Sequence, residues 1–131
     1  MIFLDSSYIL ALLLKKDKHH VVSKNLVNYL AHEKKVINIT VLQEVLNSLN
    51  IINYPKDISS LIDSILSMDK IGYLTEKDYM ESIELYKYYN KSINFSDCTI
   101  LVTMQKYNIT NIVSFDSDFD KISGVNRISG I

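Results

Sequence analysis

The sequence has few of the residues that break or cross-link a chain: one cysteine, one proline and three glycines among 131 residues. The lone cysteine, Cys98, excludes an intramolecular disulfide and fits a reducing cytoplasm, where we expect a small buried core thiol. So few prolines and glycines exclude a disordered chain and a β-sandwich rich in tight turns. The absences leave an ordered protein with long regular elements as the expectation.

The chain also lacks a strong charge of either sign and a long hydrophobic run. Its net charge is −1, which does not by itself indicate nucleic-acid binding, and Arg127 is its only arginine. The apolar N-terminal segment 1–14 is too short for a membrane span. It carries Asp5 and no leading positive charge, so it is also a poor signal peptide. We therefore expect a cytoplasmic protein with no membrane partner.

What is present is the composition of a globular protein, 47% hydrophobic and 22% charged. This length predicts one domain, residues 1–131, with a single core. Strands are predicted at 2–4, 36–39, 70–73 and 112–114, with an edge strand at 125–128, and helices at 6–14, 18–32, 41–53, 55–68, 76–89 and 97–107. The alternation predicts an α/β fold of three layers, in which helices cover both faces of a central parallel sheet of four to five strands.

Side-chain chemistry refines some of these helices. Thr40 and Ser96 are the predicted N-caps of the helices that follow them. The periodicity of segment 76–89 places four apolar residues on its inner face: Tyr79, Met80, Ile83 and Tyr86. Three more fall outside that face and are expected to be exposed: Leu85, Tyr88 and Tyr89. Exposed apolar residues often mark an interface, so this pattern favours a homodimer.

Four acidic residues occupy equivalent places, each just after a predicted strand or in the first turns of a helix: Asp5, Glu44, Asp97 and Asp116. Singly, each has a plain explanation, such as a favourable charge at a helix N-terminus or a solvent-facing glutamate. Together they converge at the carboxyl edge of a parallel sheet, where ligands bind. Carboxylates gathered there would repel one another without a divalent cation, so the set predicts a metal-dependent hydrolase.

Segments 2–7, 43–47, 95–98 and 114–119, which contain these acids, resemble the PIN-domain family in order and spacing, and most of all its VapC toxins. The resemblance implies a PIN-like ribonuclease fold in which Asp5, Glu44, Asp97 and Asp116 bind Mg²⁺ or Mn²⁺ and carry catalysis. Asp118 is a further candidate ligand. Ser6 and Ser114 stand where the family has serine or threonine and would orient the carboxylates through hydrogen bonds.

The resemblance also implies partners: an RNA substrate, a cognate antitoxin that wraps the toxin, and a second copy of the chain. Because arginine is scarce, phosphate contacts would fall to lysines such as Lys15, Lys16 and Lys18. Three other nuclease or binding roles stay open: a non-catalytic PIN-like module, a PIN nuclease of RNA processing, and a DNA-directed nuclease. A phosphoacceptor receiver domain is disfavoured, because serines follow Asp5 and no aspartate ends the strand 70–73.

Overall fold

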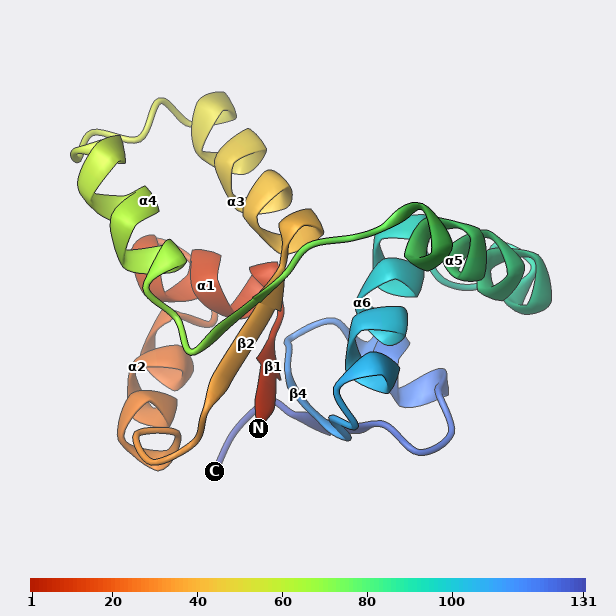
Figure 1. Ribbon diagram of the computed structural model, residues 1–131. Helices are drawn as coiled ribbons and strands as arrows, with labels where there is room; N and C mark the ends of the chain where they lie inside the picture. Colours follow the sequence, from red (N-terminus) through yellow and green to blue (C-terminus); the bar gives the residue numbers. More distant parts are fainter.

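Five short strands form one parallel sheet at the centre of the protein, in the computed structural model of residues 1–131 (Figure 1). The strands are β1 (Ile2–Leu4), β2 (Lys35–Asn38), β3 (Lys70–Gly72), β4 (Asn111–Val113) and β5 (Asn126–Ile128). They lie in the order β3-β2-β1-β4-β5, and every neighbouring pair is parallel. The predicted parallel sheet is therefore confirmed, including its edge strand near the C-terminus.

Six α-helices and one 3₁₀ helix, η1, connect and cover the strands. They are α1 (Ser6–Leu13), α2 (His20–Tyr29), α3 (Ile39–Ile51), α4 (Ile58–Leu66), α5 (Glu76–Tyr89), α6 (Phe95–Lys106) and η1 (Ser117–Lys121). Figure 1 shows α1, α2 and α4 on one side of the sheet and α5 and α6 on the other, which confirms the predicted three layers. None of these helices has both the length and the apolar character needed to cross a membrane.

The core lies where β1, β2 and β4 meet α6. Phe3, Val36 and Ile112 are fully buried in three adjacent strands, as expected for a parallel sheet covered on both faces. Every residue of α6 from Asp97 to Met104 is buried, including Cys98. Because α6 is surrounded, the carboxylate that opens it is fixed by packing and not by a flexible loop.

The predicted caps of two helices were wrong. The N-cap of α3 is Asn38, the last residue of β2, because the chain turns from strand to helix without an intervening loop. Asn94 precedes α6 and makes no side-chain cap, while Ser96 lies inside the helix. Pro55 also lies outside α4, which Asp57 caps.

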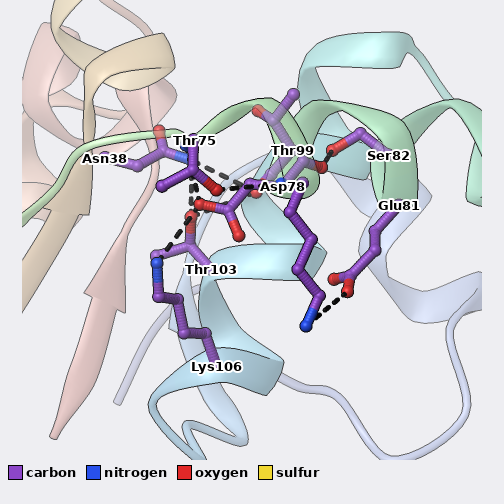
Figure 2. Close-up of polar contacts among 9 residues, drawn as sticks. Asn38, Thr75, Asp78, Glu81, Ser82, Thr99, Thr103 and Lys106 are labelled. Carbon is purple, nitrogen blue, oxygen red and sulfur yellow. Dashed lines mark hydrogen bonds and ion pairs between the residues drawn. The ribbon is translucent and has the colours of Figure 1, made fainter.

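Asn38 does more than cap a helix, because it also joins β2 to α6 (Figure 2). Its Oδ1 accepts a hydrogen bond from the Val41 backbone N–H at 3.1 Å. Its Nδ2 donates to the Thr103 hydroxyl at 3.0 Å and to the Thr99 carbonyl at 3.3 Å. The side chain is fully buried, so water cannot replace any of these bonds.

We expect Asn38→Ala to lower the free energy of unfolding by about 2–3 kcal/mol, since it removes a cap and leaves buried polar partners unpaired. Urea unfolding monitored by circular dichroism measures the change. Asp57→Ala is the matched control, because Asp57 caps an exposed helix end and its loss should cost about 1 kcal/mol or less. Equal losses in the two variants would contradict the buried role of Asn38.

The predicted faces of α5 were partly wrong. Tyr86 packs against the core and Tyr88 is exposed, as predicted. Tyr79 and Met80 were predicted to face inward but are exposed. Leu85 and Tyr89 were predicted to be exposed but pack against the core. The fully buried positions are polar: Asp78 and Ser82. Asp78 forms a capping box with Thr75 and an ion pair with Lys106 at 3.2 Å, and Figure 2 shows it turned toward α6. With this cap, the helix face that includes Asp78 and Ser82 is turned toward the core. Apolar periodicity does not predict this face, because two of its buried residues are polar.

Candidate metal centre

The acidic residues lie at the point where the strand order of the sheet reverses. Strands β2 and β3 follow β1 on one side of it, and β4 and β5 lie on its other side. The carboxyl ends of β1 and β4 are therefore neighbours, and the Asp5 N–H donates to the Val113 carbonyl at 3.0 Å. In open parallel sheets this switch point is where ligands bind.

Three carboxylates meet there. One oxygen from each of Asp97, Asp116 and Asp118 lies within 4.8 Å of the others. Asp97 is only 7% exposed, and its Oδ2 has no hydrogen-bond partner. Asp116 caps η1 by accepting from the Asp118 N–H at 2.9 Å, and Asp118 pairs with Lys121 at 2.8 Å. A buried carboxylate oxygen without a partner is costly, which makes the Asp97 Oδ2 a candidate ligand for a cation.

Asp5 and Glu44 lie outside this group of three but act on it through their charges. The buried Asp5 carboxylate accepts hydrogen bonds at its Oδ2 from the Ser114 hydroxyl at 2.7 Å and the Ser7 hydroxyl at 2.8 Å. Glu44 accepts from the Ser6 hydroxyl at 3.3 Å. Ser7 was not among the predicted supports, and its only sequence signal is its position two residues after Asp5.

The pKa values of three of these acids are raised, because the acids are buried and lie close to one another. Burial, and then the charges of Asp116 and Asp5, raise the pKa of Asp97 to about 7. Burial also raises the pKa of Asp5, although the Ser114 and Ser7 hydroxyls oppose this. Burial, followed by the charge of Asp5, raises the pKa of Glu44. All three pKa values move in the direction that a divalent cation would reverse.

The basic residues have other surroundings. Arg127 binds Asp120 through two nitrogen–oxygen contacts of 2.9 Å and donates to the Ser114 carbonyl at 3.2 Å, so the only arginine ties η1 to the sheet. Lys15 and Lys16 line a cavity of about 720 Å³ between the ends of α1 and α3. Lys18, which was grouped with them from the sequence, does not line it.

Comparison with known proteins identifies the family and the fold. The family model described as PIN domain matches residues 2–125. Among solved structures, VapC20 of Mycobacterium tuberculosis, a toxin that cleaves the sarcin–ricin loop, is 25% identical, with a TM-score of 0.79 over 92% of this chain and 94% of that one.

Two further structures share the fold at lower identity. A toxin–antitoxin complex from Klebsiella pneumoniae is 18% identical, with a TM-score of 0.71 over 96% of each chain. VapBC2 of Rickettsia felis, bound to a DNA fragment of its promoter, is 20% identical, with a TM-score of 0.71 over 98% of each chain. A direct sequence search among curated proteins found no match.

Proposed function

The chain belongs to the PIN-domain family, and on that premise we propose that it is a metal-dependent endoribonuclease formed by one domain, residues 1–131. The observation that carries the proposal is the group Asp97, Asp116 and Asp118 at the switch point, with the buried and unpartnered Oδ2 of Asp97. The fit of the fold to VapC20, which cleaves RNA, supports the substrate class.

In this proposal Asp97, Asp116 and Asp118 hold Mg²⁺ or Mn²⁺, which suits a set of hard oxygen donors. When bound, the ion supplies an activated water and stabilises charge on the scissile phosphate. The hydroxyls of Ser114 and Ser7 favour the ionised form of Asp5 and fix the direction of its carboxylate. Glu44, which is half-buried and has a raised pKa, is suited to take a proton from the attacking water.

The test is cleavage of total RNA by the purified protein with Mg²⁺, with Mn²⁺ and with EDTA. We expect cleavage with either ion and none with EDTA. Asp5→Asn, purified in the same way, excludes a contaminating nuclease. Intact RNA in every metal would overturn the proposal, and cleavage that survives EDTA would overturn its metal dependence.

Ser114→Ala should lower kcat for RNA by about 10- to 100-fold, which is the usual effect of removing a residue that orients a metal-site carboxylate. The buried Ser114 hydroxyl donates to the Asp5 carboxylate and accepts from the Asp116 backbone N–H at 3.0 Å, so its loss frees the Asp5 carboxylate and loosens the backbone that carries Asp116. The measurement is kcat against metal concentration. Ser129→Ala, in the exposed C-terminal tail, serves as the control and should match the wild type.

We further propose that the protein is the toxin of a toxin–antitoxin pair and forms a homodimer. The solved complexes of the same fold, from Klebsiella pneumoniae and Rickettsia felis, support the toxin–antitoxin part of this proposal. Co-expression with the product of the neighbouring open reading frame tests it. A stable complex in which RNA cleavage is suppressed is the expected result, and a neighbour that neither binds nor inhibits would count against a toxin.

A further inference from the structure

A second pocket adjoins the acidic centre on the side of Glu44. It has a volume of about 300 Å³ and lies between the start of α3, the start of α6 and the exposed side of α5. Glu44, which accepts a hydrogen bond from Ser6 next to Asp5, and Ser96, which precedes Asp97, are both part of its wall. The pocket therefore lies beside the residues that carry the acidic centre. No lysine or arginine lines it, so the pocket is not built for a phosphate group.

Two aromatic rings stand at the pocket with part of their surface in solvent. Phe95, the first residue of α6, is 38% exposed, and Tyr79 on α5 is 42% exposed. The Phe95 ring forms an edge-to-face pair with Tyr86, with ring centres 6.0 Å apart and an angle of 79° between planes. The Phe95 ring is thus held by packing while part of its surface stays exposed. Exposed rings of this kind are the platforms on which proteins stack unpaired bases.

The rest of the wall is polar and uncharged apart from Glu44. Gln43 and Asn47 lie one helical turn apart on α3, where both are exposed. Neither side chain forms a hydrogen bond within the protein, so each amide has a free donor and a free acceptor. Thr40 and Thr99 are already bonded to each other at 2.8 Å and close the floor. Free amides beside aromatic rings match the edge and the face of a nucleobase.

We propose that this pocket binds one unpaired nucleobase of the RNA substrate, stacked on Phe95 and Tyr79, with its edge read by Gln43 and Asn47. The proposal rests on the ribonuclease function and deepens it, because it places the recognition of one base in a pocket beside the carboxylates. It also assigns the choice of base to α3 and not to the metal ligands.

The experiment compares Phe95→Ala, Phe95→Tyr and Tyr88→Ala with the wild type. Tyr88 is the matched control, since it is an exposed ring on α5 that does not line the pocket. Binding of a short single-stranded RNA is measured in EDTA, where no cleavage occurs, against the same oligonucleotide carrying an abasic site at the preferred position. KM and kcat are then measured with metal.

We expect Phe95→Ala to raise Kd and KM by about 5- to 150-fold with little change in kcat, as loss of a base–aromatic stack does elsewhere. Phe95→Tyr and Tyr88→Ala should bind like the wild type, and the abasic RNA should bind equally to the wild type and Phe95→Ala. Gln43→Ala, at an exposed helix position that cannot unfold the protein, should relax the base preference at the cut site.

Three results would overturn the pocket. The first is a wild type that cuts RNA together with Phe95→Ala and Gln43→Ala variants whose KM and cleavage pattern are unchanged. That result would reject the pocket but not the ribonuclease function. The second is an equal loss of affinity for normal and abasic RNA when Phe95 is replaced by alanine. The third is conversion of a dimer to a monomer by Phe95→Ala in gel filtration, which would make the pocket a protein interface. If the wild type cuts no RNA at all, the ribonuclease function fails together with the pocket.

Discussion

Asp97→Asn abolishes RNA cleavage and leaves the fold intact: we expect kcat to fall by at least about 10²-fold, the scale on which a preorganised charge at a reacting phosphate acts. Asparagine keeps the size and one oxygen of Asp97 but removes the charge. Asp97 belongs to the three-carboxylate group proposed to bind the ion, and its Oδ2 is the buried oxygen without a hydrogen-bond partner. Asp5→Asn should have the same effect, because the carboxylate bound by Ser114 and Ser7 loses its charge.

The measurement is cleavage of a defined RNA at saturating Mg²⁺ or Mn²⁺, alongside circular dichroism and a thermal melt of each variant. Asp63→Asn, on the exposed side of α4, removes one negative charge far from the site and should keep wild-type activity. Full ribonuclease activity in purified Asp5→Asn or Asp97→Asn would remove the basis of the assignment. Loss of the folded signal in either variant would show that the carboxylate is structural.

Much of the fold could be predicted because strand and helix signals depend on local pattern. Short apolar runs at β1, β2 and β4 could only be buried strands, and the intervening helices required parallel pairing. The errors arose where tertiary contacts decide. The side chain of Asn38 caps α3 from the end of a strand, and Asp78 turns α5 so that a polar stripe is buried. Both residues are polar, so a pattern of hydrophobic residues cannot predict that they are buried.

The site was predictable to a similar extent. The convergence of Asp5, Asp97 and Asp116 follows from their places at strand ends and helix starts. The sequence does not predict which carboxylate oxygens lie close enough to bind one ion, because their positions depend on the conformation of η1. This turn carries Asp118 into the group with Asp97 and Asp116, while Asp5 and Glu44 remain beside it. The sequence treated Asp118 as an addition to four acids, whereas the geometry gives it a place in the group.

The metal-free protein should lose stability as the pH rises, and Asp97→Asn should remove much of that loss. The folded state holds the pKa of Asp97 at about 7, against an ordinary value of 3.8. Between these values the folded protein keeps a proton that the unfolded chain has released, so the free energy of unfolding falls with rising pH and levels off above about 7. A pKa raised this far corresponds to at most about 4 kcal/mol.

Urea unfolding in EDTA at pH 4.5, 6 and 8 measures this effect. Asp97→Asn should be more stable than the wild type at pH 8, by about 2–4 kcal/mol, and nearly equal to it at pH 4.5. Adding Mg²⁺ at pH 8 should stabilise the wild type more than the variant, because the variant keeps only two of the three carboxylates proposed to bind the ion. If the wild type in EDTA became more stable as the pH rises, the result would contradict the mutual repulsion of Asp97 and its acidic neighbours.

Asp78→Asn provides the comparison of opposite sign. The Thr75 backbone N–H, and then Lys106, lower the pKa of Asp78, so this carboxylate stabilises the fold above its ordinary pKa and loses that contribution as the pH falls. Its replacement should therefore weaken the protein most at pH 8, where Asp97→Asn strengthens it most. The two carboxylates are both buried and belong to neighbouring helices. Burial and the negative charges of Asp116 and Asp5 raise the pKa of Asp97, whereas the Thr75 N–H and Lys106 lower the pKa of Asp78, and this difference accounts for their opposite responses to pH.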